Sequence, residues 1–296
     1  MKDWDCRKII TLVAPLICAL GVLLVNTGCA STKGGDDLRA LGLRYRLEEI
    51  KKPRPNRVHI LRVDLANRRI RPAVVVVADP DGDGPAEAAL TDPMKLADDP
   101  AVLAFVNANP WDSFPDAKGQ RNRRWFEGQP VDIIGMAVSG SEERSPSKPS
   151  AVSVWIKEPG YAFLGDSLQD RPVADGTAGF QRIVTDGAVI VSPSANRAPR
   201  TAIGVNRAGS VMWLVVVDGR QEHYSEGMDL YELAQVMRDL GCWKATNMDG
   251  GGSSIMGLTG ADRRLRVMNS PSDRRLGITR IRPLPVILTI RERPQN

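Results

Sequence analysis

Short apolar runs bounded by turn residues fill most of this chain from residue 57 onward. Residues 58–65 alternate apolar and polar side chains, and 73–78 is a continuous apolar run with four valines at its centre. Such runs, bounded by Gly, Pro, Asn or Asp, predict β-strands. The same pattern predicts strands over 101–106, 151–156, 183–191, 202–205, 211–217, 242–248 and 278–290. The chain must therefore build at least one β-sheet.

One segment, 229–240, carries a clear helical pattern. Its leucines and methionine recur at spacings of three and four residues, which places them on one helix face. Asp229 and Glu232 match a capping box at the start, and Gly241 follows the last turn. The order strand 211–217, helix, strand 242–248 predicts a βαβ unit. Parallel strands would bring Asp218 and Asp249 to one sheet edge, where such sheets bind ligands.

The composition excludes several classes of protein. The chain has 296 residues, a net charge of +5, 42% hydrophobic and 25% charged residues. These values are typical of a globular protein and exclude a long disordered chain, a collagen-like repeat and a multi-span membrane protein. The only two histidines argue against a His-rich zinc site and a Ser-His-Asp triad. The arginine clusters lack interleaved aromatic residues, so we expect no nucleic-acid partner.

The N-terminal segment resembles a lipoprotein signal. Residues 9–25 are uncharged and apolar, and they lead to Gly28-Cys29-Ala30, although Asn26 stands where a bacterial lipobox usually has Leu. This predicts a signal peptide over 1–28, a lipidated Cys29 and a tether over 29–56. The protein would then be a lipoprotein of the bacterial cell envelope, on the outer membrane facing the periplasm where two membranes exist. The alternative is an uncleaved anchor with an incidental cysteine.

The segment Asp249-Gly250-Gly251-Gly252-Ser253 follows a predicted strand. Successive glycines let a ligand approach bare backbone, and their N–H groups form an anion-binding nest. A tight glycine-rich turn capped by Asp249 is an equal alternative. The segment is neither a P-loop, since no Lys-Ser/Thr follows, nor a nucleophile elbow.

Two further segments carry side chains suited to a sugar phosphate. Arg200 opens the predicted strand before Asp218, and a guanidinium can hold a phosphate with two hydrogen bonds, although exposed arginines are common. Asn107 and Trp111 follow the strand 101–106, and amides and aromatic rings contact sugars. The alternative for this second segment is a turn with a core tryptophan. Cys242, alone in the mature chain, is expected to be a buried apolar residue.

Several segments together are similar to the phosphodiester glycosidase family. The matching motifs, in family order, are VHILRVDL (58–65), PRTAIG (199–204), VVVDGR (215–220), SEGMDLYELAQVMRDLGC (225–242), NMDGGGSSIM (247–256) and MNSPSD (268–273). The resemblance covers about 57–292. One departure is that Asn107 is followed by Ala108-Asn109, where family members usually have two glycines.

The resemblance implies an α+β fold: a single domain over 57–292 with a curved, largely antiparallel or mixed sheet and packed helices. It implies a hydrolase that cleaves the anomeric bond of a sugar-1-phosphodiester, with an N-acetylglucosamine-like sugar, in envelope or extracellular glycans. The partners are then a glycan or sugar-phosphate substrate and, through the lipid, the membrane. The alternative is a non-catalytic glycan-binding envelope lipoprotein, and a third possibility is a phosphodiesterase that cuts the P–O bond.

The implied site residues fall into three groups. Asp249 and Asp218 would act as acid/base or electrostatic groups, or would hold a divalent cation such as calcium. Arg200 and the backbone of 250–252 would bind the phosphate. The remaining substrate-binding candidates are Asn107, Thr201, Asn247, Gly250, Gly251, Gly252 and Ser253. Neither a metal requirement nor an oligomeric state follows from the sequence.

Overall fold

The computed structural model describes residues 33–294, apart from residues 83, 117, 122–124, 149–150, 158–160 and 166–172. Residues 32–296 form one compact unit, separate from residues 1–31. The predicted signal peptide and Cys29 lie outside the described residues. The hydrophobic clusters and strand pairs of the described part all lie inside the 32–296 unit. This unit therefore carries its own hydrophobic core, and we expect it to fold on its own.

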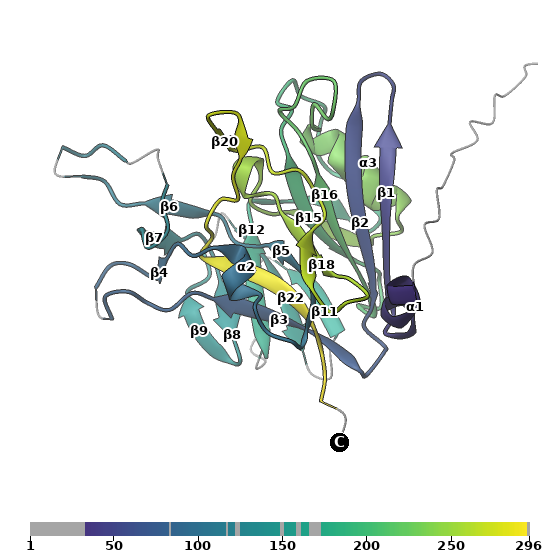
Figure 1. Cartoon of the computed structure of the whole chain (residues 1–296), viewed down its shortest axis with the longest axis horizontal. Helices are drawn as coiled ribbons and strands as arrows, with labels where there is room; N and C mark the ends of the chain where they lie inside the picture. Colours follow the sequence, from purple (N-terminus) through teal and green to yellow (C-terminus); the bar gives the residue numbers. More distant parts are fainter. Residues whose placement is uncertain are drawn as a thin grey trace, which may run out of the picture. The chain divides into compact units, whose positions relative to one another are not determined.

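The largest sheet has seven strands (Figure 1), and its central strands are buried on both faces. Alternate residues of β16 enter different hydrophobic clusters: Leu214 and Val216 belong to one, Val215 and Val217 to the other. Burial on both faces explains the continuous apolar run of this strand. In spatial order the strands are β1 (Leu43–Ile50), β2 (Asn56–Asp64), β16 (Val211–Val217), β15 (Arg200–Val205), β17 (Lys244–Asn247), β13 (Gln181–Thr185) and β14 (Ala188–Val189).

A five-stranded sheet packs on this sheet through the larger hydrophobic cluster, which contains Leu61 and Leu214 of one sheet and Val106 and Leu288 of the other. In spatial order its strands are β19 (Leu265–Val267), β18 (Met256–Thr259), β5 (Val102–Asn107), β22 (Val286–Glu292) and β3 (Ile70–Val76). The predicted strand over 278–290 thus begins only at Val286, after Pro283 and Pro285, because proline cannot donate to a ladder.

Three smaller sheets complete the described part. A second five-stranded sheet has the order β11 (Tyr161–Gly165), β10 (Val152–Lys157), β12 (Asp175–Gly179), β8 (Ala137–Ser139) and β9 (Glu142–Ser145). A three-stranded sheet has the order β4 (Ala88–Ala89), β7 (Pro130–Ile133) and β6 (Trp111–Ser113). The strands β20 (Arg274–Arg275) and β21 (Ile278–Thr279) form a separate hairpin.

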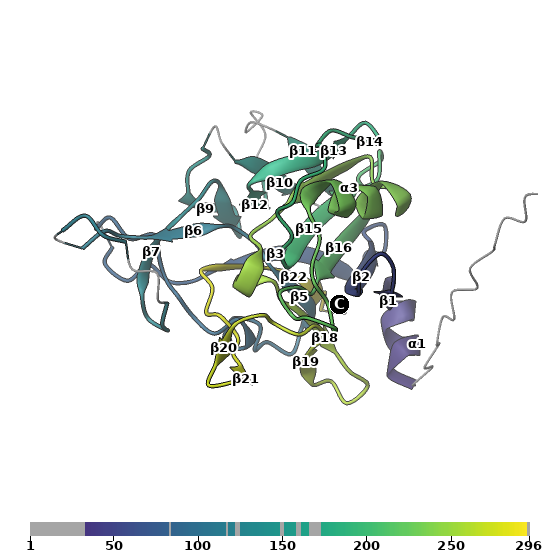
Figure 2. The same ribbon diagram turned by 90° about the horizontal axis from the view of Figure 1, so that it is seen from above.

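The helices are few and short. Helix α3 (Leu230–Asp239) lies along one face of the seven-stranded sheet and buries Leu233 and Met237 there (Figure 2). Helix α2 (Pro93–Leu96) is one turn capped by Asp92, and helix α1 (Lys33–Ala40) precedes β1. A single 3-10 turn, η1, covers Gly251–Ser253.

The α+β class predicted from the sequence is wrong. Strands account for 46% of the described residues and the three short helices for 9%, so the protein is mostly β, with multiple antiparallel sheets. The physical reason is that only α3 combines a sustained apolar face with caps at its ends. The other sheet faces are largely covered by neighbouring sheets rather than by packed helices.

The predicted βαβ unit contains all of its expected elements, but the two strands are not neighbours. β16 and β17 are each antiparallel to β15, which lies between them, so they run in the same direction. Their carboxyl ends, followed by Asp218 and Asp249, therefore meet at one edge of the sheet. The structure also places β1, inside the segment assigned to the tether, in a ladder with β2.

Candidate active site

The glycine loop after β17 is shaped by close contacts with backbone and side chains. Gly251 has φ of +61°, a left-handed conformation that suits glycine. A Cβ at Gly251 would lie 3.1 Å from Nη1 of Arg220, and one at Gly250 would lie 3.0 Å from the carbonyl oxygen of Pro199. The two glycines therefore let the loop approach β15 and the Arg220 side chain.

Gly252 is required by an ion pair that packs directly on its backbone. A Cβ at Gly252 would overlap both the Asp273 carboxylate and the Arg282 guanidinium. Arg282 holds Asp273 through two hydrogen bonds, from Nε (2.9 Å) and Nη2 (3.1 Å). The MNSPSD segment is thus clamped against the glycine loop.

The Asp249 carboxyl lies at the start of the glycine loop. Its Oδ1 accepts a hydrogen bond from the N–H of Gly250 (2.9 Å), and the residue is half-buried. Burial raises the pKa of Asp249, although a hydrogen bond from Ser253 and the charge of Arg282 act in the opposite direction. A carboxyl group with a raised pKa retains its proton closer to neutral pH, as a general acid requires.

Asn107 positions the glycine loop rather than presenting a free amide. Its Nδ2 donates to the carbonyl oxygen of Asp249 (2.7 Å). Its Oδ1 accepts from Oγ1 of Thr201 (2.7 Å) and from the N–H of Ile255 (3.1 Å). The Asn107 amide therefore connects β5 and β15 to both ends of the loop.

Asp218 lies at the centre of a buried hydrogen-bond network. The residue is only 1% exposed, and its Oδ1 accepts from the N–H of Ser270 (2.8 Å) and from Nδ2 of Asn269 (3.1 Å). Its Oδ2 lies 3.1 Å from Nε2 of His59. A buried carboxyl group that accepts several hydrogen bonds holds its donors in place. The groups that bury Asp218 also leave no room for substrate to reach it.

Tyr45 extends this network on the far side of His59. The Tyr45 hydroxyl lies 2.9 Å from Nδ1 of His59. Burial, together with the negative charge of Asp218, raises the pKa of Tyr45 to about 12, so the phenol keeps its proton. The Tyr45 hydroxyl and the Asp218 carboxyl thus hold the two ring nitrogens of His59 from opposite sides.

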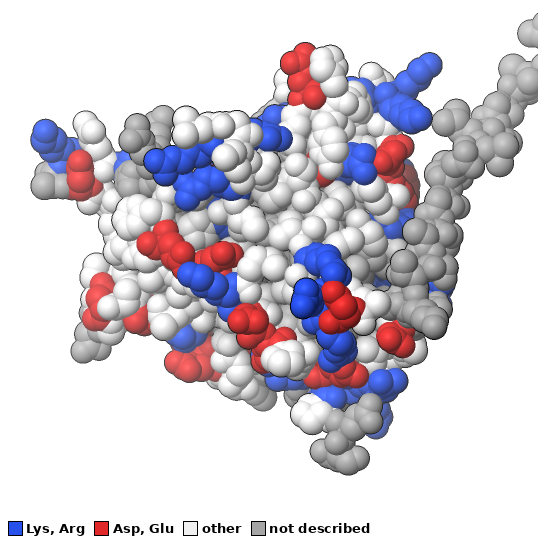
Figure 3. Space-filling view, viewed as in Figure 1, with Lys and Arg blue, Asp and Glu red and all other residues white. Residues whose placement is uncertain are grey.

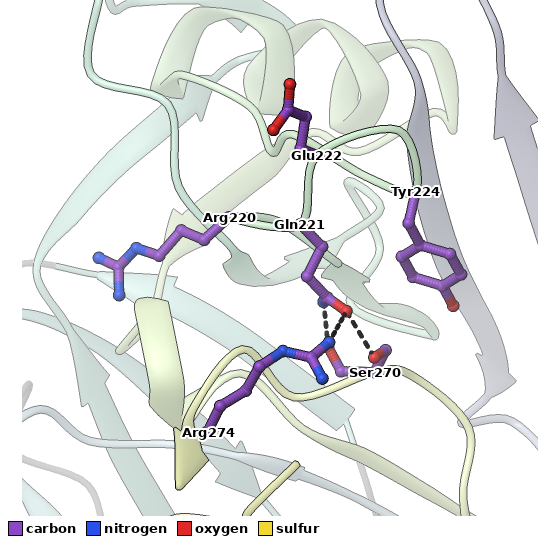
Figure 4. A pocket seen from close by; sticks show the side chains of 6 residues that line it. All are labelled: Arg220, Gln221, Glu222, Tyr224, Ser270 and Arg274. Atoms are coloured by element: carbon purple, nitrogen blue, oxygen red, sulfur yellow. Dashed lines mark hydrogen bonds between the residues drawn. The ribbon is translucent and has the colours of Figure 1, made fainter. Parts of the chain in front are cut away.

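An open cleft of about 600 Å³ lies next to these groups. Figure 4 shows the six residues that line it: Arg220, Gln221, Glu222, Tyr224, Ser270 and Arg274. The Gln221 side chain joins the two walls, since its Nε2 donates to the carbonyl oxygen of Ser270 and its Oε1 accepts from Nη2 of Arg274, both at 2.8 Å. Arg220 reaches from this cleft to Gly251, so the cleft and the glycine loop form one site.

The other predicted residues have different surroundings. Nε of Arg200 donates to the carbonyl oxygen of Met228 (3.0 Å), and its Nη2 donates to that of Asn196 (2.7 Å). Burial lowers the pKa of Arg200. The guanidinium thus holds two loops together, and its phosphate-binding role stays a prediction. Asn247 is 4% exposed, and no partner for its Oδ1 is found among the described residues.

Sequence reasoning missed several site residues. Arg220, Gln221, Tyr224 and Arg274 line the cleft but were not singled out. His59, Asn269 and Ser270 stand inside the VHILRVDL and MNSPSD motifs, so those motifs contained a signal that was not used.

Within the described ranges, no group of three or more His, Cys, Asp or Glu side chains is placed to hold a metal ion. No helix in the described part of the chain is both long and apolar enough to cross a membrane.

Comparisons with known proteins agree with the motifs. The sequence model of the phosphodiester glycosidase family matches residues 140–291, just over half of the chain. No curated protein matches. Among solved structures, the catalytic domain of zebrafish N-acetylglucosamine-1-phosphodiester alpha-N-acetylglucosaminidase, auto-inhibited by its pro-peptide, is similar. It has 19% identity and a TM-score of 0.60, over 85% of this chain and 83% of that one.

Two further structures share the fold. A protein from Burkholderia pseudomallei K96243, described as exported, has 15% identity and a TM-score of 0.54 over 80% of this chain and 74% of that one. A hypothetical protein from Synechocystis has 13% identity and a TM-score of 0.52 over 85% of this chain and 62% of that one. At these identities the likeness concerns the fold, and the family match rests on the sequence. The chain belongs to the phosphodiester glycosidase family.

Proposed function

We propose that this protein is a hydrolase that cleaves the anomeric bond of a sugar-1-phosphodiester with an N-acetylglucosamine-like sugar. Membership of the phosphodiester glycosidase family supports the reaction class. The sugar named in the activity of the similar zebrafish enzyme supports the choice of sugar. The observation that carries the proposal is the half-buried Asp249 carboxyl, with its raised pKa, beside bare glycine backbone and an arginine-lined cleft.

Arg220 and Arg274 are the proposed phosphate ligands, in place of Arg200. Both line the cleft, and Arg220 also contacts the glycine loop at Gly251. Guanidinium groups hold phosphate oxygens through paired hydrogen bonds, and the charge that develops on a departing phosphate strengthens them. These two arginines would therefore stabilise the leaving group more than the intact diester.

Asp249 is the proposed proton-transfer group. Water attacks the anomeric carbon, the bond from that carbon to the bridging oxygen breaks, and the phosphate departs with that oxygen. A phosphate is already a good leaving group, so the main task is to support an oxocarbenium-like transition state. Asp249 would donate a proton to the leaving oxygen or take one from water, while Asp218 keeps Asn269 and Ser270 in position.

The glycan-binding alternative rested on the altered segment after Asn107, and the structure gives that segment another role. Asn109 is 1% exposed, and its Nδ2 donates to the carbonyl oxygen of Met136 (3.0 Å). Its Oδ1 accepts hydrogen bonds from Thr177 and from the N–H of Ala178. Asn109 thus connects the segment after β5 to the sheet that contains β12, and it is not among the residues that line the cleft. The altered segment therefore gives the glycan-binding alternative no support.

The test compares turnover of a synthetic N-acetylglucosamine-1-phosphodiester by the 32–296 unit and by two variants. Asp249→Asn keeps the shape of the side chain but removes its acidity, so turnover should fall by a factor of about 100 or more. Asp64→Asn is the matched control, because Asp64 is also half-buried and also accepts a backbone N–H. Binding of the diester without release of sugar by the unmodified protein would instead make it a glycan-binding protein.

The cellular context is part of the proposal. The lipobox-like segment supports attachment through Cys29 to the cell envelope, on the outer membrane where two membranes exist. The substrate would then be an envelope or extracellular glycan.

A further inference from the structure

The β20–β21 hairpin, whose backbone is seen in Figure 1, carries exposed apolar side chains at its tip. Leu276 is 94% exposed and Ile278 is 71% exposed, the two highest values among the large apolar side chains of the described part. Leu276 and Gly277 form the two-residue turn, with φ of 51° and 78°. Such turns are dominated by Gly, Asn and Asp, so a leucine is unfavourable there. The conformation of the turn therefore does not explain why a leucine occupies position 276.

Positive charge surrounds this apolar tip. Arg274, Arg275 and Arg280 are exposed, and the hairpin contains neither Asp nor Glu. Within the described residues, neither Arg275 nor Arg280 forms an ion pair, and Arg280 stacks on the ring of Trp125 at 5.4 Å. The nearest acid in sequence, Asp273, is already held by Arg282. Figure 3 shows basic side chains gathered over the region where β20 lies in Figure 1.

The combination of an apolar tip and a ring of arginines fits an anionic lipid surface. Two apolar side chains are too small a patch for a stable protein interface, which buries about 800 Å² on each partner. At a bilayer, in contrast, apolar side chains enter the boundary between headgroups and acyl chains, and arginines contact lipid phosphates. We propose that the β20–β21 hairpin docks this domain on an anionic lipid bilayer, with Leu276 and Ile278 inserted and Arg275 and Arg280 on the headgroups.

Docking would bring the cleft to the lipid surface. Arg274 begins the hairpin and lines the cleft, so the two features are continuous. An enzyme held this way would meet substrates at the bilayer before those in solution. The docking itself does not depend on the proposed hydrolysis, because it involves no residue assigned to proton transfer.

The test is co-sedimentation of the 32–296 unit with vesicles, which removes the apolar N-terminal segment as a source of binding. The unit should pellet with vesicles of equal parts phosphatidylcholine and phosphatidylglycerol, and not with phosphatidylcholine alone. Binding should be strong at about 0.1 M salt and largely lost at about 1 M, where the Debye length falls to about 3 Å. The Leu276→Glu, Ile278→Glu double variant should bind at least about tenfold more weakly.

Matched control variants distinguish binding through the hairpin from a general effect of surface charge or surface apolar residues. Ile190→Glu changes another exposed apolar residue, directly after β14, and should bind as the unmodified unit does. Arg275→Glu should weaken binding by roughly tenfold, whereas Arg68→Glu in an exposed turn should not. Hydrolysis of a soluble diester should be unchanged in the hairpin double variant, so loss of docking and loss of activity are read separately.

Three results would overturn the proposal. The first is equal pelleting with neutral and anionic vesicles, or none with either. The second is a double variant that binds as tightly as the unmodified unit. The third is that the unmodified unit binds no vesicles but forms a dimer in solution, measured by light scattering, and that the double variant is a monomer. This result would assign the hairpin to contact with a second copy.

Discussion

At Asp249 the pKa shift has a consequence for stability. Burial raises the pKa of this carboxyl, so the folded protein holds the proton more tightly than the unfolded chain, in which the pKa of Asp is about 3.9. Folding stability from this group is therefore present at low pH and is lost as pH rises through the raised folded value.

The direction of this pH dependence predicts how Asp249→Asn changes the stability of the protein. The variant cannot ionise, so it should be more stable than the unmodified protein at neutral pH, and the difference should vanish near about pH 3. Urea unfolding of both proteins across this pH range measures the difference. A gap that stays constant with pH would show that the Asp249 carboxyl does not titrate in the folded state as described.

Gly252 provides a second prediction at the residue scale. Gly252→Ala should destabilise the protein by about 1–3 kcal/mol, because the new Cβ overlaps the Asp273–Arg282 ion pair. Gly260→Ala is the control, since its Cβ meets mainly the exposed Arg266 side chain, which can move. Thermal midpoints compare the two variants, and equal losses would contradict a specific clamp on the glycine loop.

Among the elements, α3 was the most predictable from sequence. Its capping box is formed as expected, with the N–H of Glu232 donating to Oδ1 of Asp229 (2.8 Å). Oδ2 of Asp229 also accepts the N–H of Ser194 (2.7 Å), so the residue joins the helix to the preceding loop.

Asp229→Ala should therefore lower the free energy of unfolding by about 1–2 kcal/mol, since it removes the cap and leaves the N–H of Ser194 unpaired. Asp239→Ala at the other end of α3 is the control. This carboxylate lies near the negative end of the helix dipole, so its removal should be neutral or slightly stabilising. Chemical denaturation measures both, and a neutral Asp229→Ala would show that the cap is dispensable.

Other elements were predictable only in part, for physical reasons. Strand 211–217 could be recognised because an apolar run is a local signal. That β15 lies between β16 and β17 is a long-range fact with no local trace, so the sequence predicts the parallel direction of these two strands but not the strand between them. Strand β1 lies in the segment predicted as a tether, although Leu43, Tyr45 and Leu47 alternate with charged residues. Its pairing with β2 stabilises this strand, and that pairing has no local signal in the sequence.

The candidate site divides in the same way. Three consecutive glycines after a strand single out Asp249 and its loop as a site candidate, and their role in the site stays a prediction. Arg220 ends the motif VVVDGR and Arg274 follows the motif MNSPSD, but an arginine in a loop has no local pattern that distinguishes a site residue from an exposed one. Only folding brings the two to one cleft.

For the whole molecule, attachment through Cys29 is a prediction about the complete chain. Cys29→Ala should block lipidation and processing, so the variant should keep its full-length gel mobility. Fractionation and metabolic labelling with a fatty acid measure this. If the variant had the same fatty-acid labelling and the same gel mobility as the unmodified protein, this would contradict the lipobox and favour a plain N-terminal anchor.

The central claim concerns which bond the whole enzyme breaks. Hydrolysis of a sugar-1-phosphodiester in oxygen-18 water identifies the broken bond directly, because the label marks the atom that water attacks. We predict the label on the anomeric oxygen of the released sugar, read before that oxygen exchanges with solvent, and none in the phosphomonoester. Oxygen-18 in the phosphate would contradict the account, since the protein would then be a phosphodiesterase that cuts the P–O bond.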